Sequence, residues 1–69
     1  MPDQIYKTIE LTGSSTTGIE SAIQNALDKA SKSVRQMRWF EVADIRGHIV
    51  DNKVAHWQVS MKVGFALED

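Results

Sequence analysis

Apolar and polar positions alternate along most of this chain, and the period of the alternation changes in one region. Residues 4–11 alternate loosely, which is typical of a strand. Between residues 15 and 35 the apolar side chains recur at steps of three and four, as they do on one face of a helix. Residues 37–50 and a last segment to about residue 67 return to a period of two. The pattern predicts the order strand, helix, strand, strand.

The helix is predicted from one apolar stripe. Residues 12–15 have turn chemistry and lead into it, with Ser15 or Thr17 as the expected N-cap. Thr17 and Glu20 have the spacing of a capping box. We expect about 18 helical residues, or roughly 27 Å at 1.5 Å per residue. The stripe consists of small and aliphatic side chains: Ile19, Ala22, Ile23, Ala26, Leu27, Ala30 and Val34.

The strand at residues 37–50 contains a slip in its apolar phase. Phe40 and Val42 share one face, but the apolar positions that follow, from Ile45 on, are displaced by one residue. Such a slip indicates a β-bulge, here near Ala43–Asp44. Corrected for the bulge, the polar face carries Trp39, Glu41, Asp44, Arg46 and His48.

A hairpin turn is predicted at Asp51–Asn52, because Asp and Asn tolerate the positive φ of tight turns. The register that pairs apolar with apolar residues places Ile45 opposite Val59, Gly47 opposite Trp57, Arg46 opposite Gln58, His48 opposite His56, Val42 opposite Met61, Phe40 opposite Val63 and Glu41 opposite Lys62. The predicted fold is an α+β domain over residues 1–69, β-α-β-β, in which a three-stranded antiparallel sheet packs on one amphipathic helix.

Composition narrows the class of protein. The chain has 69 residues, no cysteine and a net charge of −1 from eight basic and nine acidic side chains. Disulfides and thiolate sites are therefore excluded, and no basic patch indicates a nucleic-acid partner. No apolar stretch has membrane-spanning length, and residues 1–4 lack the features of a signal peptide. We expect a cytoplasmic protein without a membrane partner.

Trp39 is the residue that most needs an explanation, because a large aromatic side chain on a polar sheet face requires a partner. A neighbouring subunit, a ligand or both could provide it. A domain this short rarely gets more than roughly 3–5 kcal/mol from its own core. A three-stranded sheet also has two open edges, which closed symmetric assembly would cover. These observations predict a homo-oligomer.

Several stretches of the chain resemble one known family. They are Leu11-Thr12-Gly13-Ser14-Ser15, Ala22-Ile23-Gln24, Trp39-Phe40-Glu41-Val42, Ile45-Arg46-Gly47-His48, Ala55-His56-Trp57-Gln58-Val59 and Val63-Gly64-Phe65. In order, spacing and total length they resemble the dodecins, small flavin-binding proteins that assemble as hollow dodecamers. The resemblance implies a homododecameric flavoprotein that stores FMN, riboflavin or a related flavin and protects it from light.

The resemblance also implies a cofactor site. The tryptophan that matches Trp39 stacks on the isoalloxazine ring, and two flavins lie together between the tryptophans of symmetry-related subunits. The residue matching Gln58 hydrogen-bonds the pyrimidine edge, which a carboxamide suits because it offers a donor and an acceptor. Asp44 matches a residue near the ribityl chain in some members. Arg46 belongs to the same pocket, where it could hold the FMN phosphate or instead form an ion pair between subunits.

One position departs from the family pattern. Many bacterial members carry an arginine after Val-Gly-Phe, which is associated with a second ligand, coenzyme A, and with subunit contacts. Here the position is Ala66, which argues against a coenzyme A site.

Two other functional classes remain open at this stage. A purely structural shell or interaction module would use Trp39 for assembly and bind no flavin. An enzyme is not expected, since Ser60 and His56 share a face without an oxyanion donor or an orienting carboxylate. His48 and His56 are too few for a structural zinc site, so no metal site is predicted.

Overall fold

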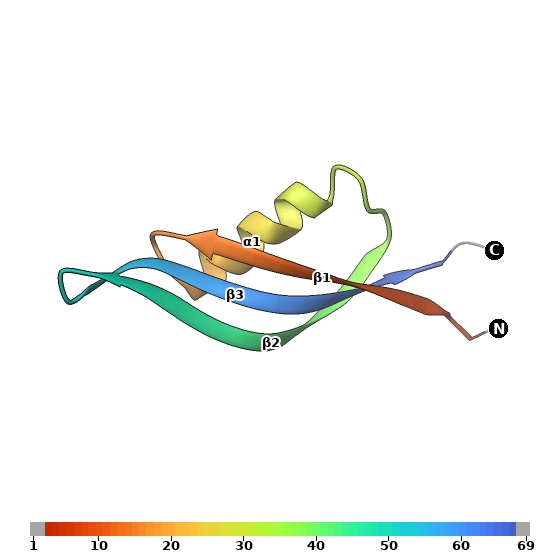
Figure 1. The fold of residues 1–69 in the computed structure, drawn as a ribbon. Coiled ribbons are helices and arrows are strands. Elements are labelled where there is room, and N and C mark those ends of the chain that lie inside the picture. The colour runs from red at the N-terminus through yellow and green to blue at the C-terminus, as the bar shows by residue number, and fades with distance from the viewer. Residues whose placement is uncertain (1–2, 68–69) are drawn as a thin grey trace.

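The computed structural model describes residues 3–67 as three strands and one helix (Figure 1). β1 spans Tyr6–Ser15, α1 spans Ile19–Ala30, β2 spans Met37–Val50 and β3 spans Lys53–Ala66. The strands lie in the order β1-β3-β2 and both pairs are antiparallel. The central strand is therefore β3, and β1 and β2 each have an open edge. The predicted β-α-β-β order, α+β class and three-stranded antiparallel sheet are confirmed.

The hairpin of β2 and β3 follows the predicted register. Its turn is at Asp51–Asn52, where φ is 52° and 64°. Positive φ at both central positions is typical of a type I′ turn, whose twist matches that of the strands. The predicted pairs are all present: Ile45 with Val59, Gly47 with Trp57, Arg46 with Gln58, His48 with His56, Val42 with Met61, Phe40 with Val63 and Glu41 with Lys62.

Three β-bulges interrupt this hairpin. The predicted one is at Ala43, which has no partner between Val42 and Asp44. The other two, at Arg38 on β2 and Ala55 on β3, were not predicted. The bulge at Arg38 has a direct consequence for the polar face. Since a bulge inverts the alternation of side chains, it turns Trp39 away from the helix and opposite Gly64.

The core is built on the central strand. Val59, Met61 and Val63 are almost completely buried, and Ala22 of α1 packs directly on them. Burial of side chains of this kind stabilises a fold by about 1.5–3 kcal/mol each. Around them lie partly buried side chains from β1, α1 and the start of β2: Ile9, Leu11, Ile19, Ile23, Ala26, Leu27 and Met37. The alternation of β3 is confirmed in this core, and so is the predicted apolar stripe of the helix from Ile19 to Ala30.

The first strand is longer than predicted, because residues 12–15 belong to β1 and not to a turn. Gly13 has a structural purpose there. A Cβ at this position would overlap the backbone carbonyl of Ala22, so the absence of a side chain lets α1 lie directly against the strand. The sequence pattern was misread because glycine beside threonine and serine is more typical of a turn.

The predicted cap of the helix is wrong. Gly18 is the N-cap, and no side chain forms a capping hydrogen bond. Ser15 lies at the end of β1, where its Oγ accepts a hydrogen bond from the Thr17 backbone N–H at 3.0 Å. This local bond stabilises the turn between strand and helix. It involves both Ser15 and Thr17, the residues that were expected to cap the helix.

The helix is also shorter than predicted, with 12 residues. It ends at Ala30, and the next residue, Ser31, is the C-cap, whose Oγ donates a 2.8 Å hydrogen bond to the Asp28 carbonyl oxygen. Serine side chains compete in this way for backbone groups. Val34, predicted on the helical stripe, therefore lies in the connection to β2.

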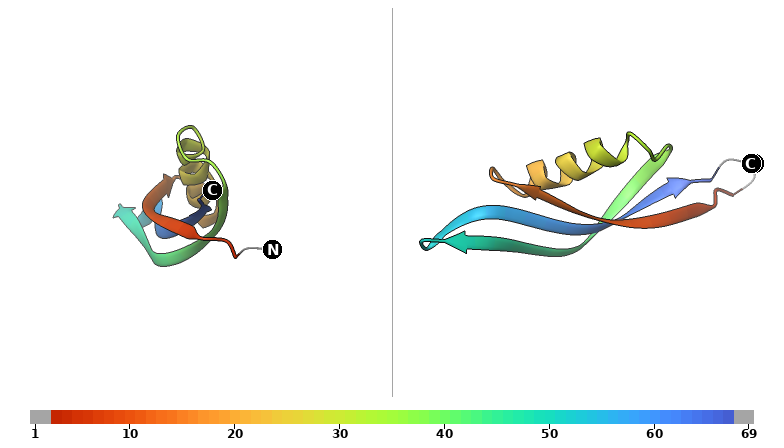
Figure 2. Two further views of the ribbon diagram at one scale, coloured as in Figure 1. Left: turned by 90° about the vertical axis from the view of Figure 1, so that its right-hand side faces the viewer. Right: turned by 45° about the horizontal axis from the view of Figure 1, so that its top comes forward.

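One strand is left largely uncovered. The helix packs on β1 and β3, and the hairpin tip projects beyond it (Figures 1 and 2). On the helix side of β2, Phe40, Val42 and Ile45 remain 45 %, 39 % and 49 % exposed. The radius of gyration is 14.3 Å, against roughly 11 Å for a compact domain of this length. The fold is thus elongated and exposes apolar surface that a compact monomer would bury.

Candidate functional site

Trp39 is held on the sheet face away from the helix by two neighbours. Its indole lies over Gly64, the residue opposite it on β3. The ring of Tyr6 meets it edge-on, with centroids 6.1 Å apart and an angle of 68° between the planes. Edge-to-face pairs of this kind fix the orientation of both rings. Trp39 is nevertheless 41 % exposed, so a fixed part of its π surface is available for stacking.

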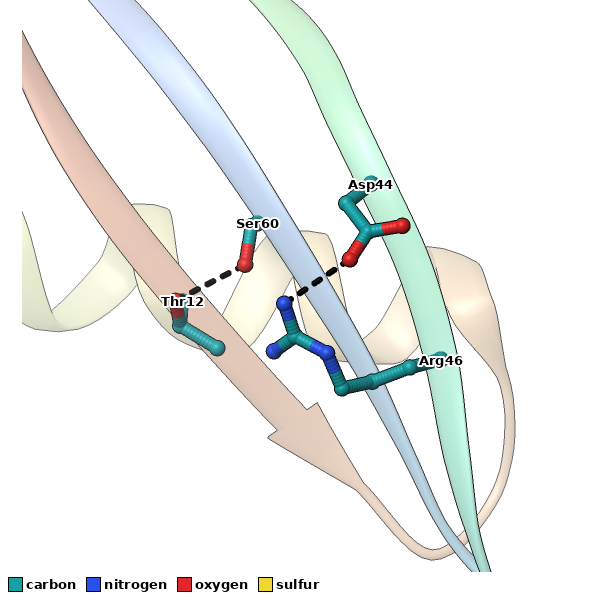
Figure 3. A network of polar contacts seen from close by, with 4 residues as sticks. All are labelled: Thr12, Asp44, Arg46 and Ser60. Atoms are coloured by element: carbon teal, nitrogen blue, oxygen red, sulfur yellow. Dashed lines mark hydrogen bonds and ion pairs between the residues drawn. The ribbon is translucent and has the colours of Figure 1, made fainter.

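A polar cluster lies farther along the same face (Figure 3). Arg46 Nη2 and Asp44 Oδ2 form an ion pair at 2.8 Å, with side chains 49 % and 57 % exposed. Beside them, the hydroxyl groups of Thr12 and Ser60 share a hydrogen bond of 3.0 Å. Gln58 is directly opposite Arg46 and is half-buried. The carboxamide, guanidinium and carboxylate therefore form one cluster with donors and acceptors.

The structure does not bring Trp39 to this cluster within one chain. Trp39 is opposite Gly64, six residues along β3 from Gln58. At ~3.3 Å per residue this separation is roughly 20 Å, which is longer than a flavin ring system. Three of the four predicted site residues are thus neighbours, and Trp39 is at the far end of the same face. Within one chain, Gln58 and Trp39 are therefore not neighbours.

A small cleft lies at the start of β2 on the helix side of the sheet, on the other face from the Trp39 indole. It measures about 250 Å³ and is bordered by Leu27, Met37, Arg38, Trp39, Phe40 and Val63. Pockets that enclose cofactor-sized ligands are generally about 300–1,000 Å³. A larger cleft of about 380 Å³ lies between β1 and α1, but its walls, which include Asn25 and Lys29, offer no aromatic ring for stacking. Neither of these two clefts encloses the exposed face of the indole, so a flavin stacked there would need a second chain to cover it.

Two other kinds of site find little support. Ser60 and His56 share a face, but they are four residues apart on one strand, or roughly 13 Å. The Ser60 hydroxyl is paired with Thr12 instead. Within residues 3–67, no group of three or more His, Cys, Asp or Glu side chains could hold a metal ion. Over the same residues, no helix is long and apolar enough to cross a membrane.

Comparison with known proteins assigns the family. The family model described as Dodecin matches residues 5–68. The chain belongs to the dodecin family. The Dodecin of Thermus thermophilus is 48 % identical over 66 residues, which are 96 % of each chain. The family resemblance carried by the sequence motifs is confirmed. Flavin binding and storage is the function of the dodecins, which are binding proteins and not enzymes.

Solved dodecin structures share the fold. The dodecin from Streptomyces coelicolor has a TM-score of 0.93 and 45 % identity, and the match covers 100 % of this chain and 99 % of that one. A more distant match is the calcium dodecin of Mycobacterium tuberculosis, a calcium-chelating antigen with a novel calcium-binding site. It has a TM-score of 0.79 and 26 % identity, over 93 % and 91 % of the two chains.

Sequence reasoning missed two residues of the Trp39 environment, Tyr6 and Gly64. Tyr6 is on β1, and only the pairing of β1 with β3 brings its ring to the indole. The Val63-Gly64-Phe65 motif contained the signal for Gly64. Ala66, the position that departs from the family pattern, is buried opposite Tyr6 and offers no charge.

Proposed function

We propose that this protein binds and stores flavin, with the isoalloxazine ring stacked on Trp39. The observation that carries the proposal is the fixed, part-exposed indole at Gly64 and Tyr6 in a chain of the dodecin family. An indole whose orientation is already set loses little entropy when a ligand stacks on it. FMN and riboflavin are the flavins to test first.

The polar cluster would act on the flavin from a second subunit. The roughly 20 Å between Trp39 and Gln58 excludes a site made by one chain, whereas two chains with their polar faces together could combine one indole with the partner's cluster. There Gln58 would pair with the pyrimidine edge, which needs a donor and an acceptor side by side. Asp44 would accept from ribityl hydroxyls. Arg46 would change partner from Asp44 to the phosphate of FMN.

Assembly is the second part of the proposal. The exposed side chains of Phe40, Val42 and Ile45 form an apolar strip on β2, and both sheet edges are open. A second copy of the chain would cover this surface at the cost of little conformational entropy, because the strands are already ordered. An assembly with closed symmetry would leave no sheet edge exposed. The family resemblance implies that this assembly is a homododecamer.

The arrangement favours sequestration of flavin over catalysis. An electron-rich indole against an excited flavin can quench it by rapid electron transfer and return, which suppresses photochemistry. Two flavins stacked between two indoles would also leave no open ring face for a substrate or for hydride transfer. The chain's own contribution is to hold the ring, pair its polar edge and exclude water from it.

A fluorescence titration tests this function. FMN or riboflavin is held at fixed concentration and the purified flavin-free protein is added. We expect near-complete quenching that saturates at one flavin per chain, and the two curves rank the ligands. Flavin fluorescence that stays undiminished at a large excess of protein would overturn the proposal and favour the structural alternative, in which Trp39 serves assembly alone.

A further inference from the structure

His48 and His56 form an exposed pair between the polar cluster and the tip of the hairpin, two residues beyond Arg46 and Gln58 on the same face. They are directly opposite each other on β2 and β3. The centroids of the two imidazole rings are 6.2 Å apart, with the planes tilted by 53°. Neither ring has a hydrogen-bond partner in the part of the chain that the structure describes. Both imidazoles are therefore free to accept another ligand.

We propose that this pair chelates a divalent transition-metal ion of the class that prefers imidazole, such as Ni²⁺, Cu²⁺ or Zn²⁺. Two imidazoles are too few for a closed structural zinc site, but they suffice for an ion that keeps water in its other positions. Metal–nitrogen bonds of ~2.1 Å at nearly a right angle require the two nitrogens to be roughly 3 Å apart. Opposite residues on paired strands have Cβ atoms about 4.5–5.5 Å apart. Side-chain rotation alone can therefore bring both nitrogens to one ion.

The backbone holds the pair in register. The type I′ turn at Asp51–Asn52 fixes the alignment of the two strands, and the bulge at Ala55 lies next to His56. Neither residue has to be ordered on binding, as would be needed in a loop. Folding has thus already placed His48 and His56 next to each other, so metal binding does not carry the entropic cost of bringing them together.

The charges around the pair permit a cation. Arg46, two residues from His48 on the same face, directs its guanidinium to the carboxylate of Asp44 at 2.8 Å (Figure 3). That ion pair neutralises the nearest fixed charge on this strand. Lys53 is the other nearby cation, and it is exposed at the turn, where its flexible side chain can extend into water.

Calorimetric titration of the untagged full-length protein with NiCl₂ and with ZnCl₂ tests the proposal. We expect about one ion per chain, and we expect His48→Asn or His56→Asn to weaken binding about tenfold or more, because each leaves a single imidazole. CaCl₂ should give no heat that depends on either histidine, since Ca²⁺ selects oxygen ligands. Single variants that bind Ni²⁺ and Zn²⁺ as tightly as the parent would overturn the proposal.

Thermal unfolding gives a second, independent readout. An ion that links β2 to β3 binds only the folded hairpin, so saturating Ni²⁺ should raise the unfolding temperature of the parent protein. The same addition should leave the two single variants almost unchanged. An equal rise in parent and variants would place the metal elsewhere.

Discussion

The indole of Trp39 occupies the space that a side chain at Gly64 would fill. A Cβ built on Gly64 would overlap Cε2 and Cζ2 of the indole and would come within 2.6 Å of its Nε1. Glycine at this position therefore lets the ring lie close to the sheet. The orientation of the indole depends on the absence of one methyl group on the neighbouring strand.

Gly64→Ala should displace the indole and weaken flavin binding. Overpacking of this kind typically costs 1–3 kcal/mol, so we also expect a fall of about that size in the free energy of unfolding. Flavin affinity is measured by fluorescence quenching and stability by urea denaturation. Gly18→Ala is the matched control, because a Cβ there meets nothing within 4 Å and its small cost at the N-cap is offset by reduced entropy of the unfolded chain. Equal effects of the two variants would contradict the proposed support of Trp39.

Trp39→Ala should lose most of the affinity for flavin and most of the quenching, with the oligomer intact by size-exclusion chromatography. The reason is the loss of the aromatic surface on which the isoalloxazine ring would stack. Trp57→Phe is the control for loss of an indole, since Trp57 is half-buried on the helix side of β3. Unchanged flavin affinity in Trp39→Ala would show that the site lies elsewhere.

Arg46→Ala should weaken FMN binding more than riboflavin binding, because only FMN carries a phosphate for the guanidinium. The two flavins are compared in parallel quenching titrations at low and at high salt, where the difference should shrink. Protein stability should change by less than about 1 kcal/mol, since the ion pair with Asp44 is exposed. Equal losses for both flavins would assign Arg46 to the ring or to a subunit contact.

Val42→Lys should produce smaller species by native mass spectrometry, because it places a charge in the apolar strip of β2 that a partner chain is proposed to cover. Lys32→Glu alters an exposed charge after the helix and should leave the assembly unchanged. An intact oligomer in Val42→Lys would show that this strip faces solvent.

Met61→Ala should lower the free energy of unfolding by about 2–5 kcal/mol, because it removes a side chain that is 1 % exposed and leaves a cavity in a small core. Urea denaturation measures the change at fixed protein concentration. Lys62→Ala, the exposed neighbour, should stay within about 0.5 kcal/mol of the parent. A Met61→Ala loss below 1 kcal/mol would mean that the assembly, and not this core, dominates stability.

Local patterns predicted the sheet well, because each of them acts between neighbouring residues. The alternation of β3, the turn at Asp51–Asn52 and the phase slip at Ala43 all follow from the two-residue period of a strand. Together they fixed the hairpin register and placed Trp39 on the polar face. The same reasoning failed at the two ends of the helix, where the Ser15 and Ser31 side chains form hydrogen bonds with nearby backbone groups.

The sequence by itself determined which residues share a face and which residues pair across the hairpin. Only the tertiary structure decided what covers each face and how far apart the members of one face lie. Gly13 lies in a strand, where the absence of a side chain leaves room for the helix to pack against it. Tyr6 contacts Trp39 because β1 pairs with β3. Along a strand, a shared face does not mean contact, since every residue adds ~3.3 Å. For that reason Trp39 and Gln58 belong to one surface, but only a second chain could bring both to the flavin that we propose.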